Sequence, residues 1–307
     1  MKNALNYYYD FDNIEIHQKN KDYYFKNNNY EYMFLKYDDL LDVNEIYQLS
    51  IQLNKIGFPS HEIILNKQGN ILTKINENNY ILLKIIVVKE NININNIISF
   101  NNLPNAYIDF PKSLYRNNWY QLWINKIDYL EYQINQIGRK YFLLRESFSY
   151  YIGLAENAIC LIKNIDTNKL IFSLSHKRIN NKNTTYELYN PLNFIIDLRI
   201  RDVCEYFKNK FFDNENIVNE IFIYLEYNKL SKEESICFMA RMLFPTYYFD
   251  VYEKIINNEI DENNINNILS KVDKYEQLIA NIYLYFKNIH SIPDIEWLKK
   301  LSYIDNF

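Results

Sequence analysis

The spacing of the hydrophobic residues changes along the chain, and this change limits the folds that the sequence can adopt. In the first 90 residues, short aromatic or β-branched segments alternate with Asn-rich turns, which predicts strands. From about Leu114 onward, apolar residues recur at the three- and four-residue spacing of amphipathic helices. We therefore expect an α+β fold with two lobes: a small β-rich N-terminal lobe with one helix, and a larger, mostly helical C-terminal lobe.

The N-terminal lobe is expected to begin with short strands throughout residues 1–37. Residues 23–25 and 30–37 are rich in aromatic side chains and flank the Asn-rich segment 26–29. This arrangement predicts a hairpin whose turn is residues 26–29.

One helix is expected in this lobe, over residues 38–56, where apolar residues form a single stripe. Asp38 or Asp39 could cap its start, and Gly57 ends it. Three further strands are expected at residues 62–65, 71–75 and 80–88, and the last is predicted to be buried because it is rich in Ile and Val.

The second half of the chain predicts a helical lobe with a β hairpin inserted in it. The Asn-rich segment 91–102 is interpreted as a linker between a lobe of residues 1–90 and a lobe of residues 103–307. The hairpin is expected at residues 170–174 and 186–196. Helices are expected from about residue 114 and over residues 145–162, 202–212, 217–227, 232–242, 246–256, 265–287 and 295–304.

Composition excludes several classes of protein. The net charge is −4 and no basic block stands out, so we expect no nucleic-acid partner. The excess of Asn, Ile, Lys and Tyr is typical of an AT-rich genome. The longest apolar run, residues 80–88, is about half the length needed to cross a bilayer, and residues 1–13 lack the apolar core of a signal peptide. Three scattered cysteines, Cys160, Cys204 and Cys237, fit free thiols in a reducing compartment, so a cytoplasmic protein is expected.

A short motif suggests the chemistry of the site. His176 and Asn183 stand at the spacing of the catalytic loop H-x-D-x-x-x-x-N of kinase-like phosphotransferases. In that loop the Asp orients the acceptor hydroxyl and the Asn helps to hold Mg²⁺. Here Arg178 stands at the Asp position. Asp197 ends an apolar segment shortly afterwards and resembles the second metal-binding Asp of the fold.

Three further segments resemble one family within this fold. Residues 240–250 read A-R-M-L-F-P-T-Y-Y-F-D, residues 123–131 read W-I-N-K-I-D-Y-L-E, and residues 201–207 read R-D-V-C-E-Y-F. They are similar to signature segments of the spore-coat-associated CotS/YutH group, and the resemblance covers about residues 119–253. It implies a bilobal protein-kinase-like (aminoglycoside-phosphotransferase-like) fold. It also implies a role in sporulation, for a protein made in the mother cell and deposited in, or acting on, the spore coat.

The resemblance implies roles for the residues of the loop. His176, Arg178 and Asp197 would occupy the catalytic positions, and Asn183 and Asp197 would hold any Mg²⁺. Structural alternatives stand beside these roles: His176 could bond the backbone and pack, and Asn183 could be one more Asn in an Asn-rich loop. Asp202 would steady the loop and cap the helix that follows it.

The resemblance also implies a nucleotide site in the N-terminal lobe, with ATP as the nucleotide. Lys36 would pair with phosphates and Glu45 would be its ion-pair partner. The alternative is an exposed strand-end Lys36 and a solvated Glu45. Lys84 is a rival for Lys36, because a lysine inside an apolar strand must extend to solvent or find a partner.

Packing is the expected role of the segment 240–250. Arg241 is expected to pair with a carboxylate such as Asp202 or Asp250, and Pro245 to begin the next helix. The aromatic residues that we expect to pack are Phe244, Tyr247, Tyr248 and Phe249.

Two departures from the kinase pattern decide the functional hypothesis. Arg178 is a permanent cation that only donates hydrogen bonds, so it cannot replace an Asp as a base. None of the four glycines lies in the hairpin around residues 26–29, where a glycine-rich phosphate loop is expected. We therefore expect a catalytically degenerate, pseudokinase-like scaffold that binds coat proteins, in the mother-cell cytoplasm or the spore coat.

Two alternatives stay open. One is an active phosphotransferase that uses ATP and Mg²⁺ on a small molecule or a coat protein. The other is a helical interaction protein unrelated to kinases, in which the motif matches arise by chance.

Overall fold

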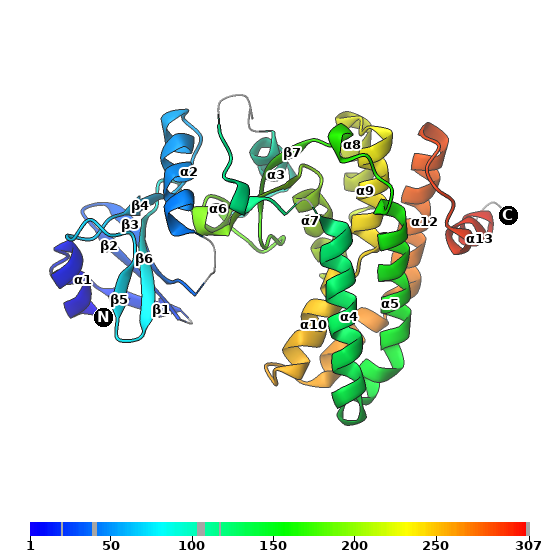
Figure 1. Cartoon of the computed structure of the whole chain (residues 1–307), viewed down its shortest axis with the longest axis horizontal. Helices are drawn as coiled ribbons and strands as arrows, with labels where there is room; N and C mark the ends of the chain where they lie inside the picture. The colour runs from blue at the N-terminus through cyan, green and yellow to red at the C-terminus, as the bar shows by residue number, and fades with distance from the viewer. Residues whose placement is uncertain (20, 39–41, 103–107, 117, 305–307) are drawn as a thin grey trace. The chain divides into compact units, whose positions relative to one another are not determined.

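The chain forms two compact units in a computed structural model that describes all residues except 20, 39–41, 103–107, 117 and 305–307. Unit 1 consists of Met1–Tyr115 with Ser173–Asp197, and unit 2 of Arg116–Phe172 with Leu198–Phe307. Figure 1 shows the sheet in the first and the long helices in the second. The division into lobes at residues 91–102 stays a prediction.

An antiparallel sheet of six strands organises unit 1. Its order is β1-β2-β3-β6-β4, with β5 paired to β6. The strands are β1 (Ile16–Lys19), β2 (Asp22–Asn27), β3 (Tyr30–Lys36), β4 (Glu62–Ile64), β5 (Thr73–Ile75) and β6 (Asn78–Lys84). The predicted strands are confirmed, but β6 ends at Lys84 and not at residue 88.

The chain begins with a helix, α1 (Lys2–Tyr9), where we expected a strand. Leu5 of α1 is fully buried in a cluster formed with alternate residues of three strands. Successive strand residues point to opposite faces, so these residues share one face of the sheet. The strand residues of the cluster are Phe25, Tyr32, Phe34, Tyr80 and Leu82. The prediction of strands from residue 1 is wrong here, because residues 2–9 form a helix that packs on this aromatic face of the sheet.

Helix α2 (Val43–Lys55) confirms the predicted helix but not its cap. The side chain of Asp42 accepts a hydrogen bond from the Asn44 N–H at 2.8 Å. Asp38, one of the two predicted caps, instead pairs with Lys36, and Asp39 lies outside the described residues. Gly57 ends the helix as predicted, with a φ of 76° that favours glycine.

The expected linker contains a helix, α3 (Ile94–Asn101), which begins with a capping box formed by Asn93 and Asn96. We read this Asn-rich segment as a loop, whereas Asn is also a favoured N-cap residue. Further along unit 1, β7 (Phe172–His176) pairs with β8 (Phe194–Leu198).

Residues 186–193, predicted to be part of the hairpin strands, form helical turns instead. They are α6 (Thr185–Leu188) and the 3₁₀ turn η5 (Pro191–Asn193). Thr184 starts the first with a capping box and Pro191 stands at the first position of the second. The prediction failed because these start signals outweigh the β propensity of the aromatic residues between them.

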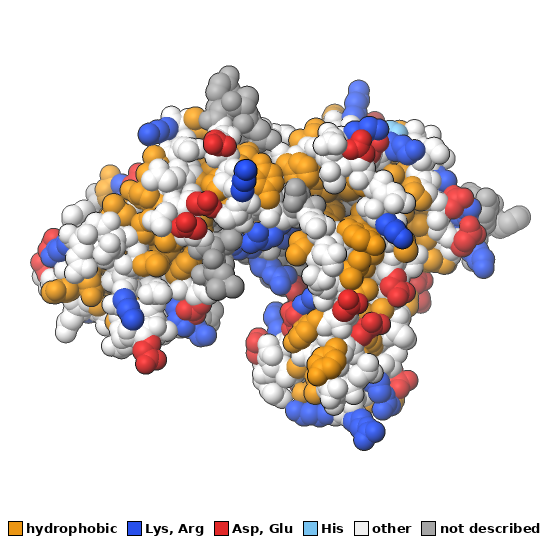
Figure 2. Space-filling model, viewed as in Figure 1, with side chains coloured by type: hydrophobic (Ala, Val, Ile, Leu, Met, Phe, Trp, Pro, Cys, Tyr) orange, Lys and Arg blue, Asp and Glu red, His pale blue; other side chains and the backbone are white. Residues whose placement is uncertain are grey.

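Unit 2 is a bundle in which helix α5 packs against α4 and α9, and α9 also contacts α7 and α12. The helices agree with the predicted ones within a few residues, except that the predicted helix 265–287 is broken near its start. Figure 2 shows hydrophobic side chains interspersed with charges of both signs on the visible face of this unit. The helices are α4 (Trp119–Ile137), α5 (Phe142–Ile162), α7 (Arg201–Phe212), α8 (Val218–Asn228), α9 (Lys232–Leu243), α10 (Thr246–Ile256), α11 (Asn266–Leu269), α12 (Val272–Ile289) and α13 (Glu296–Ile304).

Among the described residues, no helix combines the length and the apolar character needed to span a membrane.

The cap of α2 gives a direct test of the fold. Asp42→Ala should lower the free energy of unfolding by about 1 kcal/mol, because an N–H at the helix start loses its acceptor. The control is Asp38→Ala, which removes an exposed ion pair with Lys36 and should cost less than about 0.5 kcal/mol. Urea titrations followed by circular dichroism would measure both, and a larger effect of the control would show that the helix begins earlier.

Candidate functional site

The β7–β8 loop holds the residues that resemble a catalytic loop, and His176 is its first fixed point. The His176 side chain is buried, and its Nε2 donates to the carbonyl oxygen of Leu188 at 2.8 Å. Its ring lies against Phe100, with 4.3 Å between ring centroids. These contacts support the structural alternative for His176, an imidazole that fixes the loop.

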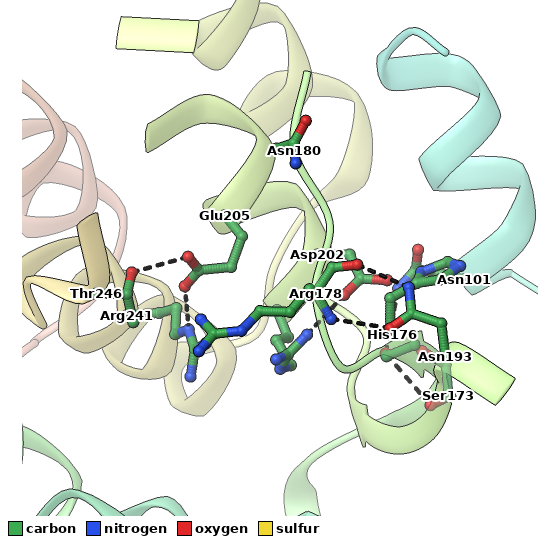
Figure 3. Close-up of polar contacts among 12 residues, drawn as sticks. Asn101, Ser173, His176, Arg178, Asn180, Asn193, Asp202, Glu205, Arg241 and Thr246 are labelled. Atoms are coloured by element: carbon green, nitrogen blue, oxygen red, sulfur yellow. Dashed lines mark hydrogen bonds and ion pairs between the residues drawn. The ribbon is translucent and has the colours of Figure 1, made fainter. Parts of the chain in front are cut away.

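Arg178 is held at the expected position through its backbone. Its N–H donates to Asn193 Oδ1 at 3.1 Å, and Asn193 Nδ2 donates to the Arg178 carbonyl oxygen at 2.8 Å (Figure 3). The neighbouring Lys177 is held by main-chain acceptors. Its N–H donates to the Asn193 carbonyl oxygen, and its ammonium donates to the Leu192 carbonyl oxygen. Both Arg178 backbone groups are therefore satisfied, while its side chain is exposed.

Asn183 closes the other end of the loop. Its Oδ1 accepts from the Asn180 N–H at 2.7 Å, and its own N–H donates to the Asn180 carbonyl at 3.2 Å. Its carbonyl oxygen accepts from the Ile92 N–H at 3.3 Å. The side-chain oxygen that would coordinate Mg²⁺ thus shapes the loop itself, which supports the structural alternative for Asn183.

Asp197 lies in β8 and is 1% exposed. The described residues contain no group of three His, Cys, Asp or Glu side chains that could hold a metal ion. A magnesium ion at Asp197 would therefore need amide, water or phosphate oxygens for most of its ligands.

The predicted pair of Lys36 and Glu45 is not the pairing that the structure forms. Lys36 Nζ lies 2.7 Å from Asp38 Oδ2, while Glu45 accepts a hydrogen bond from Ser113 Oγ. The prediction was wrong because Asp38, two residues along the chain, pairs with the Lys36 ammonium. The rival Lys84 pairs with Glu62 at 3.2 Å.

The two hairpins at the start of the sheet contain no glycine. The β1–β2 ladder closes at Lys19 and Asp22, and its turn includes residue 20, which lies outside the described residues. The segment 26–29 joins β2 to β3, which confirms the predicted hairpin and its Asn-rich turn. Its central residues Asn28 and Asn29 take up the left-handed conformation that asparagine tolerates, with φ of 48° and 65°.

The loop also lacks a carboxylate that could serve as a base. Glu187 is the only acidic residue between positions 177 and 193. Its carboxylate accepts from the Thr184 N–H at 2.8 Å and from the Thr184 hydroxyl at 2.6 Å, in the capping box of α6. The loop residues therefore do not fit a kinase-type transfer from Mg²⁺-bound ATP, which needs a carboxylate on the acceptor hydroxyl.

His61, which the sequence analysis did not single out, also anchors the loop. It is fully buried, its N–H donates to the Tyr189 carbonyl at 2.9 Å, and its Nε2 donates to the Tyr186 carbonyl at 3.0 Å. Its Nδ1 has no hydrogen-bond partner. Burial lowers the pKa of His61 to about 4, against opposing effects of the Tyr186 carbonyl and Glu187.

A second polar cluster lies in unit 2 and involves the segment 240–250. Glu205 accepts from Arg241 Nε at 2.6 Å and from the Thr246 hydroxyl at 2.8 Å (Figure 3). Lys208, which is 1% exposed, lies 2.8 Å from the same carboxylate and also donates to the carbonyls of Arg241 and Phe244. Glu205, and neither aspartate that we named, is thus the carboxylate that accepts from Arg241 Nε.

Charge balance and aromatic packing explain why this cluster can be buried. Burial alone would raise the pKa of Glu205, but Lys208 and Arg241 together hold it well below its usual range. The Arg241 guanidinium also lies 5.0 Å from the ring of Trp119. Phe244 stacks on Trp123 with 4.3 Å between centroids, so the predicted packing role of the segment is confirmed.

The comparisons with known proteins agree with this architecture. The model of the family described as spore coat putative kinase YutH matches residues 2–282. The chain belongs to this family. The endospore coat-associated protein YutH of Bacillus subtilis (strain 168) is 25% identical over 293 residues, covering 85% of this chain and 86% of that protein.

Solved structures similar to this YutH-family chain include a phosphotransferase and a kinase. An aminoglycoside phosphotransferase from Alicyclobacillus acidocaldarius gives a TM-score of 0.62 at 12% identity, over 89% of this chain and 92% of that one. An amicoumacin kinase in complex with AMP-PNP, Ca²⁺ and Ami gives 0.59 at 10% identity, over 91% and 92%. At these identities the likeness shows the fold alone. The predicted kinase-like α+β fold is confirmed, and the hypothesis of a helical protein unrelated to kinases is wrong.

The buried His61 predicts a specific dependence of stability on pH. Its folded pKa lies below the unfolded value of 6.5, so the unfolded chain binds the proton more tightly. The stability from neutral His61 is complete above pH 6.5 and is lost as the pH falls toward about 4, by up to about 1.4 kcal/mol per pH unit.

We expect His61→Gln to flatten this part of the curve, while His17→Gln, at an exposed position, should leave it unchanged. Urea unfolding at several pH values would measure the slopes. Parallel curves for the native chain and His61→Gln would contradict the assignment.

The unit 2 cluster predicts a large cost for removing its central charge. Glu205→Gln should lower the free energy of unfolding by about 3–5 kcal/mol, because it leaves Lys208 and Arg241 buried without their counter-ion. Glu215→Gln is the control, since its ion pair with Lys210 is half-exposed and should contribute less than about 1 kcal/mol. Similar effects of the two variants in a urea titration would refute the role given to Glu205.

Proposed function

We propose that this protein acts in the spore coat as a kinase-fold scaffold that does not transfer phosphoryl groups by the usual carboxylate-assisted route. The observation that carries the proposal is the backbone clamp between Arg178 and Asn193. It fixes a permanent cation at the position where kinase-like loops carry the Asp.

Two further features support a degenerate site. The only carboxylate of the loop, on Glu187, is engaged in the capping box with Thr184. The first two hairpins of the sheet offer no glycine turn through which backbone N–H groups could approach a triphosphate closely, since no glycine precedes Gly57.

Family membership supports the biological setting. A YutH-family protein is expected to be made in the mother-cell cytoplasm during sporulation and to join the coat, with coat proteins as partners. A scaffold needs a stable fold and surfaces for partners, and it needs no turnover at the loop.

An active phosphotransferase that uses ATP and Mg²⁺ is the second candidate. Asp197 favours it, because a buried carboxylate at the end of β8 is what a metal-dependent site would need. Asn183 and Lys36 would then supply the remaining metal and phosphate contacts.

Nucleotide binding distinguishes the two candidates. We expect millimolar ATP with Mg²⁺ to leave the melting temperature of the native chain unchanged, because the loop and turn residues do not form the ATP site. A shift that disappears in Asp197→Ala but persists in Asp128→Ala, an exposed control on α4, would overturn the proposal in favour of an active enzyme.

Restoring the missing carboxylate is the second arm of this test. Arg178→Asp should give no more ATP hydrolysis than Arg139→Asp, an exposed control, because the glycine turn is also missing. Strong turnover from Arg178→Asp alone would mean that the nucleotide site is intact.

A further inference from the structure

The apolar run after β6 continues past the end of the sheet. Residues 80–88 are almost entirely apolar, yet the strand ends at Lys84. Beyond it the side chains of Ile86 and Val88 are 38% and 78% exposed. A sequence typical of a buried strand is therefore left open to solvent over residues 86–88.

The backbone of this 86–88 segment is anchored at both ends and unpaired between them. The Ile85 N–H donates to the Glu31 carbonyl at 2.8 Å, and the Val88 carbonyl accepts from the Thr185 hydroxyl at 2.6 Å. In the part of the chain that the structure describes, the N–H and C=O groups of Ile86 and Val87 have no partner. Unpaired groups on a fixed apolar segment form a template for an added strand.

The exposure of the side chains alternates along the segment, although the chain bends at Val87. Ile85 is buried, Ile86 is exposed, Val87 is half-buried and Val88 is exposed. The segment thus presents two exposed aliphatic side chains next to backbone groups that can pair with another chain.

Lysines and tyrosines surround the segment. A hollow of about 540 Å³ is lined by residues 29–31, residues 84–89 and Tyr186. The Lys84 ammonium lies 4.0 Å from the centre of the Tyr30 ring and is paired with Glu62. The Lys89 ammonium lies 5.5 Å from the ring of Tyr186.

The charge of Lys89 is the one that a partner could neutralise. Lys89 is exposed and forms no ion pair within the described ranges. An acidic side chain on the partner would meet this ammonium beside the exposed Val88.

We propose that the 86–88 segment binds an extended segment of a partner protein. The partner would pair with the backbone of Ile86 and Val87, place aliphatic residues against Ile86 and Val88, and direct an acidic residue to Lys89. This inference names the partner chemistry for the proposed scaffold and rests on that function. A peptide is favoured over a flat heterocycle because the hollow is open: Val88, one of the residues that line it, is 78% exposed.

The test uses two pools of capped hexapeptides with the full chain. In one pool Val, Ile or Leu alternates with Asp or Glu, and in the other the same apolar residues alternate with Lys or Arg. We expect the acidic pool to bind with a micromolar dissociation constant, and the basic pool to bind at least tenfold more weakly. Hydrogen exchange of the Ile86 and Val87 amides should slow at least tenfold with the acidic pool.

Variants locate the binding. Lys89→Glu should weaken the acidic pool at least tenfold and Val88→Thr about threefold, whereas Ile223→Thr, at an exposed apolar position of α8, should change nothing. The proposal is overturned if neither pool binds at millimolar concentration, if Val88→Thr and Lys89→Glu bind like Ile223→Thr, or if ATP displaces the peptides. If neither the peptides nor a nucleotide binds, the 86–88 segment is not a binding surface for a partner, and the proposed scaffold function still stands.

Discussion

The β7–β8 loop depends on the carboxamide of Asn193, which satisfies both backbone groups of Arg178. Because this clamp acts on the backbone, it does not require a particular side chain at position 178. The hydrogen bonds between Asn180 and Asn183 and between His176 and Leu188 act in the same way, because in each of them a side chain bonds to a main-chain group. The loop can therefore keep its shape whether position 178 carries a carboxylate or a permanent cation.

This separation of shape from chemistry explains how the chain keeps a kinase-like fold while its loop has no carboxylate at position 178. The anchors of the loop also reach other parts of unit 1: His61 holds the carbonyls of Tyr186 and Tyr189, and the Glu90 carbonyl accepts from the Thr185 N–H. A loop held by this many hydrogen bonds contributes to the stability of the unit, so a change of the side chain at position 178 would not release it from the fold.

The sequence predicted the fold well where periodicity and end signals agree. The helices of unit 2 and the strands β2 to β6 were found because their apolar stripes are long or their turns are rich in Asn and Gly. Helix α1 and helix α3 were missed because Tyr and Asn, which are abundant throughout this chain, suggest strands and loops by composition alone. The spacing of His176, Arg178 and Asn183 identified the loop, but not the roles of Asn193 and His61, since a backbone clamp and a buried imidazole leave no pattern in the sequence.

The segment 240–250 illustrates how a family signature can record packing and not chemistry. Arg241, Phe244 and Thr246 contact a buried carboxylate, a buried lysine or a tryptophan ring. A charge taken out of water is tolerated only with a complete set of partners, so each member of such a cluster restricts the others. These residues are therefore constrained by their packing in unit 2, whereas the side chains of Arg178, Ile86 and Val88 are exposed and are not constrained by burial.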